Sequence, residues 1–177
     1  LQADEYLLFL ARIVPEKGLH YLIEAFKKIK TSYKLVIAGD CQYSVEYGKQ
    51  IEQMCRGNKN IILTGFVEGD ELYELYTNTL LYILPSEIEG MSMSILEAMS
   101  YGKCCLVSDI PENVEPTGNC VEYFKSADVQ DLKEKLEQLL IDDERRKVLG
   151  RKGQIYVQKM YQWTTIAEKT IEVYEGK

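Results

Sequence analysis

Six short apolar runs, separated by segments of helical periodicity, constrain the fold of this 177-residue chain more than any other feature. Most of these runs are apolar on both faces, as in strands that helices cover from both sides. Runs of four to six residues favour strands, and single helical segments between them favour parallel connections. The predicted strands cover residues 6–11, 34–38, 61–64, 80–84, 104–107 and 120–124. The pattern therefore predicts an α/β fold built on a parallel sheet.

The segments between the predicted strands are typical of amphipathic helices. The predicted helices cover residues 19–29, 45–55 and 70–76, and a further one ends near residue 101. From Asp128, a good N-cap residue, the chain is predicted to be helical to its end, with breaks near Gly150 and Tyr161. Residues 1–177 contain no visible repeat or linker. We therefore predict one domain, a Rossmann-like parallel sheet of about six strands with helices on both faces.

Charge and composition argue against several classes of function. The chain has 21 Lys and Arg against 28 Asp and Glu, a net charge of −7, which disfavours a nucleic-acid-binding or anionic-membrane surface. The apolar runs are too short to span a bilayer, and no secretion signal is visible. Five Cys without a C-x-x-C pair and a single His predict no metal site and a reducing, cytoplasmic location. Because the chain begins at Leu1 and not at Met, we expect a piece of a longer protein.

The loop after the first predicted strand, residues 11–18, carries two cations. Arg12 and Lys17 lie between a strand end and a helix N-terminus, where backbone amides and the helix dipole also favour an anion. A diphosphate would suit this place. The alternative is that both are solvated loop charges. The loop lacks the G-x-x-x-x-G-K-[ST] pattern of a P-loop.

The segment after the fourth predicted strand carries two acids. Glu89 is predicted in the loop, and Glu97 about one turn into the next helix. Gly90 has no side chain, so the amides of Met91 and Ser92 can closely approach a phosphate or sugar. A carboxylate accepts two hydrogen bonds from vicinal hydroxyls, as acidic residues do with ribose in related folds. Glu97 suits that role.

A second interpretation of these acids is structural. Residues 94–97, Ser-Ile-Leu-Glu, match a capping box in which Glu97 folds back onto the helix N-terminus. Glu87 and Glu89 would then be ordinary exposed loop charges. The residues by themselves leave both interpretations open.

Taken together, these segments resemble a known family. Residues 85–102, PSEIEGMSMSILEAMSYG, resemble the Glu-x7-Glu signature of retaining GT-B glycosyltransferases (glycosyl transferases group 1, family 4), with Glu89 and Glu97 as the two acids. Residues 11–18, ARIVPEKG, resemble the family's strand and loop with Arg and Lys five residues apart. TGFV at 64–67 and SDIPENVE at 108–115 resemble further landmarks, in the same order and spacing.

The resemblance implies roles for individual residues. Arg12 and Lys17 would neutralise the diphosphate of a nucleotide-sugar donor, and Glu89 would lie beside the donor sugar, so that these three form the catalytic set. Glu97 would hold the ribose. The resemblance also implies that the amides of Gly90, Met91 and Ser92 contact the donor sugar and phosphate. The nucleotide base would lie near Gly65, Phe66 and Val67. Glu115 matches a family acid.

Three positions depart from the family's pattern. Ala11 stands where a Gly usually precedes the basic residue, and the Gly-Gly usual near residues 110–111 is missing. Met91-Ser92 stands where an aromatic-Gly pair follows Glu-Gly. The last change bears on how the donor sugar is held.

Members of this family have two Rossmann-like domains, and the motifs here belong to the second, donor-binding one. The resemblance thus implies one half of a GT-B fold, without the N-terminal acceptor domain and inactive alone. Residues 161–177 resemble the family's closing helix, whose apolar residues would be partly exposed. The alternative is a plain packing helix.

The implied reaction transfers a hexosyl unit from a nucleoside-diphosphate sugar to an acceptor hydroxyl with retention, in polysaccharide or glycolipid synthesis. It needs no metal or cofactor, and the full enzyme is expected in the cytoplasm, with peripheral association at the inner face of the membrane. One alternative is a nucleotide-sugar epimerase, for which His20 is the one acid/base candidate. Another is a non-catalytic, receiver-like binding module, for which Asp40 and Asp109 are the available acids.

Overall fold

The computed structural model describes residues 2–176, and its strands form a six-stranded, fully parallel sheet. The strand order is β3-β2-β1-β4-β5-β6. The strands are β1 (Tyr6–Leu10), β2 (Lys34–Ala38), β3 (Ile61–Gly65), β4 (Leu81–Leu84), β5 (Cys104–Ser108) and β6 (Glu122–Phe124). This confirms the predicted fold class. The chain adds strands outward from β1 to one edge of the sheet and then from β4 to the other, so the point where the strand order reverses lies between β1 and β4.

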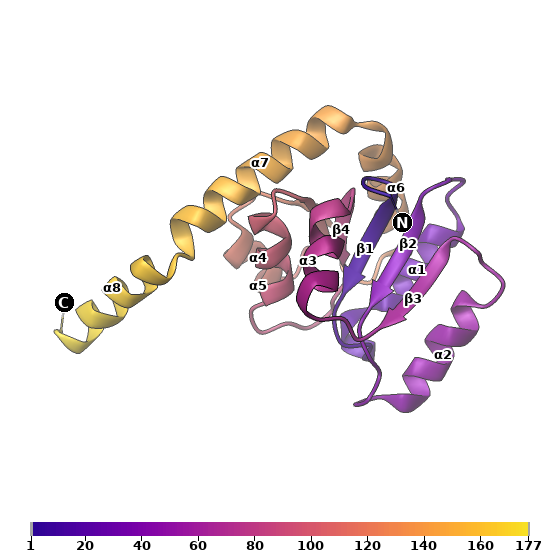
Figure 1. The fold of residues 1–177 in the computed structure, drawn as a ribbon, viewed down its shortest axis with the longest axis horizontal. Helices are drawn as coiled ribbons and strands as arrows, with labels where there is room; N and C mark the ends of the chain where they lie inside the picture. The colour runs from indigo at the N-terminus through magenta and orange to yellow at the C-terminus, as the bar shows by residue number, and fades with distance from the viewer. Residues whose placement is uncertain (1, 177) are drawn as a thin grey trace.

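Helices cover both faces of the sheet (Figure 1). They are α1 (Leu19–Lys27), α2 (Val45–Cys55), α3 (Gly69–Asn78), α4 (Met93–Ser100), α5 (Pro111–Thr117), α6 (Val129–Ile141), α7 (Asp143–Met160) and α8 (Trp163–Tyr174), with a 3-10 turn η1 (Pro15–Lys17). Helix α1 packs against α2 and α6, whereas α7 packs against α4 and α5. Asp128 caps α6 as predicted, accepting hydrogen bonds from the amides of Gln130 and Asp131. Helix α5 was not predicted, because two prolines occur in its seven residues.

The core lies in the central strands. Leu7, Leu8 and Phe9 of β1 are fully buried, so both faces of this strand are covered. Tyr6 and Tyr82 are also buried, and each hydroxyl is hydrogen-bonded to a backbone carbonyl: Tyr6 to Leu75 at 2.8 Å and Tyr82 to Leu10 at 3.1 Å. Because a buried hydroxyl without a partner is costly, these bonds allow tyrosines inside the sheet layer.

The predicted helix break near Gly150 is wrong. Helix α7 runs through Gly150 and begins at Asp143, where the side chain of Asp142 accepts a hydrogen bond from the amide of Arg145. A Cβ at Gly150 would lie 2.1 Å from the carbonyl oxygen of Gly102. The glycine therefore allows α7 to approach the turn between α4 and β5 closely. The predicted break near Tyr161 is confirmed, since α7 ends at Met160 and α8 begins at Trp163.

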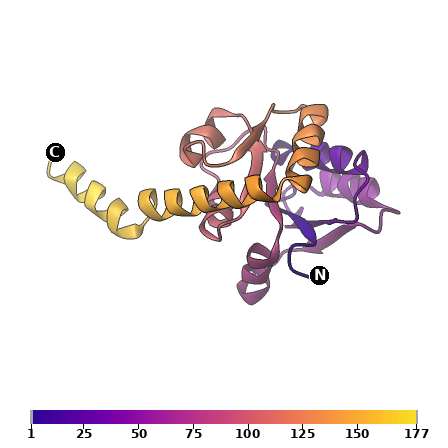
Figure 2. The same cartoon turned by 90° about the horizontal axis from the view of Figure 1, so that it is seen from above.

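Helix α8 projects from the body of the domain (Figures 1 and 2). None of its residues is buried, and Trp163 and Tyr174 are 83% and 88% exposed. The predicted exposure of its apolar side chains is confirmed, and the alternative of a helix packed within this chain is wrong. No helix within residues 2–176 combines the length and apolarity needed to cross a membrane.

Candidate functional site

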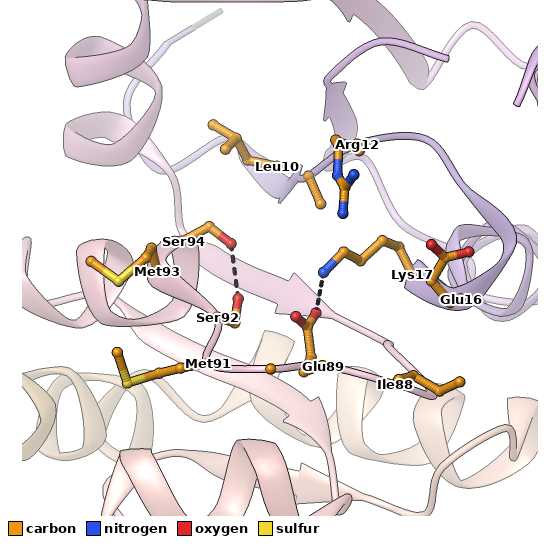
Figure 3. A pocket seen from close by; sticks show the side chains of 12 residues that line it. Leu10, Arg12, Glu16, Lys17, Ile88, Glu89, Met91, Ser92, Met93 and Ser94 are labelled. Carbon is orange, nitrogen blue, oxygen red and sulfur yellow. Dashed lines mark hydrogen bonds and ion pairs between the residues drawn. The ribbon is translucent and has the colours of Figure 1, made fainter. Parts of the chain in front are cut away.

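A crevice of about 540 Å³ opens where the connections from β1 and β4 diverge to opposite faces of the sheet (Figure 3). Open α/β sheets bind ligands at this position, beyond the carboxyl ends of the strands. The lining residues come from the loop after β1 and the loop after β4: Leu10, Ala11, Arg12, Glu16, Lys17 and residues 88–94. Two segments that are far apart in the sequence therefore form one site.

Backbone contacts hold the two loops together. The amide of Glu87 donates to the carbonyl of Glu16 at 2.9 Å, and the hydroxyl of Tyr21 donates to the Glu87 carboxylate at 3.0 Å. Gly18 has φ +65°, and a Cβ there would lie 2.0 Å from the carbonyl oxygen of Pro85. Only glycine fits this left-handed, closely approached position. These contacts dock the two loops on each other.

Lys17 and Glu89 form an ion pair across the crevice (Figure 3). The Lys17 Nζ lies 2.6 Å from the Glu89 Oε1, and the two side chains are only 14% and 4% exposed. Neither residue is a solvated loop charge, so that interpretation is wrong for this pair. Charges shielded from water act more strongly on a neighbouring ligand than surface charges do.

Ser86 forms a hydrogen bond to the Glu89 carboxylate, and the sequence motifs did not predict this role for Ser86. Its hydroxyl donates to Glu89 Oε1 at 2.6 Å, and the residue is fully buried. The Ser86 carbonyl in turn accepts a hydrogen bond from the Ser108 hydroxyl at 2.5 Å, and Asn113 Nδ2 donates to the Ser108 carbonyl at 3.2 Å. A serine directly after the strand-ending Pro85, three residues before the acid, is the signal that points to it in the sequence.

Ser86→Ala is expected to lower the free energy of unfolding by about 1.5–3 kcal/mol, because a hydrogen bond to a charged, nearly buried group is lost. Urea denaturation would measure the change. The matched control is Ser100→Ala, whose exposed side chain bonds only to the Glu97 carbonyl and whose loss is expected to cost under about 0.5 kcal/mol. Equal losses in the two variants would show that Ser86 does not stabilise the carboxylate.

Arg12 is the second cation of the crevice and is exposed. Its guanidinium carbon lies 5.7 Å from the ring centroid of Tyr43, within cation–π distance. Among residues 2–176 it has no carboxylate partner within ion-pair distance. Its positive charge is therefore available to an anion bound beside Lys17.

The N-terminus of α4 faces the same crevice. Ser92 occupies the N-cap position but makes no capping hydrogen bond, so the first-turn amides are left for a ligand. The alternative capping box at residues 94–97 is wrong, because Ser94 lies inside the helix. Glu97 Oε2 instead accepts a hydrogen bond from the Tyr76 hydroxyl at 2.8 Å. Glu97 is exposed one turn beyond Ser94, just outside the residues that line the crevice.

The predicted base-binding residues also lie outside the lining. Gly65 ends β3, the edge strand, and Phe66 is 66% exposed. Val67 lines a separate hollow beside Tyr6. One link to the crevice exists, since the Gly65 carbonyl accepts from the Gly39 amide at 2.8 Å and Gly39 packs closely on the Ala11 carbonyl. The structure thus brings together Arg12, Lys17, Glu89, Gly90, Met91 and Ser92, and leaves the roles of Glu97 and residues 65–67 as predictions.

The residues of the alternative functions lie elsewhere. His20 Nδ1 is 2.8 Å from the Tyr47 hydroxyl, outside the crevice, and burial lowers its pKa. Asp40 and Asp109 follow β2 and β5, which β1 and β4 separate, so they form no acidic cluster. Glu115 borders a neighbouring hollow with Gly90. Within the described part of the chain, no group of three or more potential ligands is arranged to hold a metal ion.

Comparisons with known proteins agree with this geometry. Residues 2–155 match the family described as Glycosyl transferases group 1. The chain is 33% identical over 151 residues to the serotype-specific mannosyltransferase WbdA of Escherichia coli, covering 79% of this chain and 18% of that protein. It is 31% identical over 185 residues to an uncharacterized glycosyltransferase of Methanocaldococcus jannaschii, covering 99% of this chain and 46% of the other.

A solved structure, Anabaena HepE in complex with UDP-glucose, shares the fold with a TM-score of 0.89 at 19% identity, over 98% of this chain and 49% of that one. The chain thus spans less than half the length of the two sequence relatives named here. With the family match extending over most of its residues, this chain belongs to the Glycosyl transferases group 1 family.

Proposed function

We propose that this chain is the donor-binding half of a retaining glycosyltransferase that transfers a hexosyl unit from a nucleoside-diphosphate sugar to an acceptor hydroxyl. The observation that carries the proposal is the crevice between β1 and β4. There Arg12, Lys17 and the uncapped N-terminus of α4 surround one space beside the nearly buried Glu89. A mannosyltransferase among the relatives and UDP-glucose in HepE support this donor class, and polysaccharide or glycolipid synthesis is the corresponding pathway class.

The proposed chemistry follows from the charges. The bond between the sugar's anomeric carbon and the diphosphate oxygen breaks, and the diphosphate leaves with the electron pair. Arg12, Lys17 and the α4 amides stabilise the negative charge that builds up on it. The acceptor oxygen bonds to the anomeric carbon, and its proton passes to the departing diphosphate. Lys17 has three donor hydrogens, so it can keep Glu89 while binding a phosphate oxygen.

The acceptor would be held by a second, N-terminal domain, and this chain alone would bind donor without transferring sugar. The exposed apolar side chains of α8, among them Trp163 and Tyr174, support contact with a further domain. The same proposal locates the enzyme in the cytoplasm, peripherally at the inner face of the membrane where the acceptor is a lipid.

Calorimetry on the chain with UDP, GDP and ADP tests the donor site. At least one nucleoside diphosphate is expected to bind with a Kd below about 1 mM, equivalent to about 4 kcal/mol. The affinity should weaken as salt is raised, because the contacts are ionic. Arg12→Ala should weaken binding, whereas Lys49→Ala, which removes an exposed cation on α2, should not. Absence of binding by all three ligands at millimolar concentration would contradict the proposal.

Retention has its own test. The anomeric configuration of the product formed by the two-domain enzyme can be read from the coupling constant of its anomeric proton in NMR. A product of inverted configuration would reject retention while leaving donor binding intact.

A further inference from the structure

Asn113 of α5 is a fully buried polar residue that does not line the crevice. Its side-chain nitrogen, Nδ2, donates hydrogen bonds to the carbonyl oxygen and the hydroxyl oxygen of Ser108, at 3.2 and 3.0 Å. Its Oδ1 has no hydrogen-bond partner among the described residues. A buried amide ordinarily has partners at both of its ends. All the hydrogen bonds of the Asn113 side chain therefore go to Ser108, the last residue of β5.

Further hydrogen bonds connect Ser108 to the Glu89 carboxylate. The Ser108 hydroxyl donates to the Ser86 carbonyl oxygen at 2.5 Å, and the Ser86 hydroxyl donates to Glu89 Oε1 at 2.6 Å. A hydroxyl has one proton to donate. Because Asn113 donates to the Ser108 hydroxyl oxygen, the proton of that hydroxyl is directed away from Asn113 and toward Ser86. Three residues that are all 0% exposed thus connect α5 to the crevice: Ser86, Ser108 and Asn113.

The hydrogen bonds on Glu89 act on one of its two carboxylate oxygens. Oε1 accepts from the Ser86 hydroxyl at 2.6 Å and from the Lys17 ammonium at 2.6 Å (Figure 3). No residue in the described part of the chain donates to Oε2 within hydrogen-bond distance. The terminal torsion of a glutamate has only a broad preference of its own, so these two bonds decide which way the carboxylate faces. They leave Oε2 for a ligand in the crevice, which Glu89 lines.

We propose that Asn113 is a positioning residue for the glycosyl-transfer reaction. It fixes the Ser108 hydroxyl and, through it, the backbone at Ser86, so that the Ser86 hydroxyl holds Glu89 in its reactive orientation. Asn113 does not line the crevice, where the two cations meet the diphosphate. Loss of the Asn113 amide should therefore lower turnover and leave the donor affinity nearly unchanged. This inference rests on the proposed function, with Glu89 in the catalytic set.

Steady-state kinetics of Asn113→Leu in the two-domain transferase, with saturating acceptor, provide the first measurement. Leucine has a similar shape and no hydrogen-bond donor, so Ser108 loses both bonds from the Asn113 side chain. The kcat is expected to fall on the order of ten-fold, because misplacing a catalytic group by 1 Å can cost about 100-fold. The KM for the donor should change less than about two-fold, since donor binding is not lost.

The second measurement tests whether the effect passes through the Ser86 hydroxyl. Asn113→Leu is repeated in a Ser86→Ala enzyme, in which this hydroxyl no longer holds Glu89. Residues that act in series are not additive, so in this enzyme Asn113→Leu should change kcat less than about two-fold. A residue that only supports the fold would lower kcat by the same factor with and without Ser86→Ala, and that result would reject the positioning role.

Thr79→Val is the matched control for the loss of a buried hydrogen bond. Thr79 is also 0% exposed, and its hydroxyl is hydrogen-bonded to the backbone carbonyls of Tyr6 and Leu81. It precedes β4 and so lies at the edge of the sheet opposite the crevice. Urea denaturation should show that Thr79→Val and Asn113→Leu both lose stability, whereas only Asn113→Leu lowers kcat. Equal falls of kcat in the two variants would overturn the proposal.

Ser108→Ala is the second variant and carries the test if Asn113→Leu does not fold. It deletes the hydroxyl that links Asn113 to Ser86, and the same loss of kcat is expected, with the same dependence on Ser86. A higher KM for the donor at unchanged kcat in these variants would overturn the positioning role while leaving sugar transfer in place. Absence of hexosyl transfer by the unchanged enzyme would instead overturn the proposed function itself.

Discussion

Lys17→Met is expected to lower the kcat of the full transferase by about 100- to 1,000-fold, with a smaller change in the KM for the donor. The reason is that negative charge on the diphosphate grows as the glycosidic bond breaks, so a cation shielded from water stabilises the transition state more than the bound substrate. Steady-state kinetics with saturating acceptor would measure both constants. A higher KM at unchanged kcat would show that Lys17 only binds the donor.

A control must separate loss of the cation from disturbance of Glu89. Removing Lys17 leaves a carboxylate that is 4% exposed without its counter-ion, and such a group destabilises the fold. Glu89 is itself a candidate catalytic residue, so stability is compared and not activity. In Lys17→Met/Glu89→Gln the uncompensated charge is gone, and the free energy of unfolding should recover toward that of the unchanged chain. Lys49→Met, at an exposed cation far from the crevice, should leave kcat unchanged.

Gly18→Ala is expected to lower the free energy of unfolding by more than about 2 kcal/mol, measured by urea denaturation. A non-glycine residue in the left-handed region costs about 1–2 kcal/mol. The added Cβ would also meet the Pro85 carbonyl oxygen at 2.0 Å, and forced overpacking costs about 1–3 kcal/mol more. Because this contact joins the loop after β1 to the loop after β4, the affinity for nucleoside diphosphates should fall as well.

Gly69→Ala is the matched control for the close approach. Gly69 has a similar φ of +58°, and a Cβ there would have nothing within 4 Å. The free energy of unfolding of Gly69→Ala should therefore fall only by the cost of placing a non-glycine residue in the left-handed region. Similar losses of stability in the two variants would mean that the contact with Pro85 carries no strain.

The sheet could be predicted because its strands are apolar on both faces. Residues 7–9 have no polar side, and the short length of this apolar run favours a strand buried from both sides over a buried helix. Helix α5 and the continuity of α7 could not be predicted. Two prolines in α5 and Gly150 in α7 are local signals against a helix, and tertiary packing outweighed them, most directly where Gly150 meets the Gly102 carbonyl.

The sequence predicted which two loops form the candidate site, but not which side chains contact one another within it. The two charged loops were identified because segments that follow parallel strands share one edge of the sheet. The capping box was wrong because α4 begins at Met93, so Ser94 is not the N-cap, and Tyr76 from another helix is the partner of Glu97. Ser86 was missed because its role depends on the position of the Glu89 carboxylate and not on a pattern of neighbouring residues.

The amino-acid sequence by itself determined the strands and most of the helices, because hydrophobic periodicity acts between residues that are close along the chain. Only the tertiary structure decided which charges are buried and with what partner. Lys17 and Glu89 are 72 residues apart, and they meet because β1 and β4 are neighbours in the sheet. An ion pair of this kind depends on strand order and on exclusion of water, and neither is written in the residues around it.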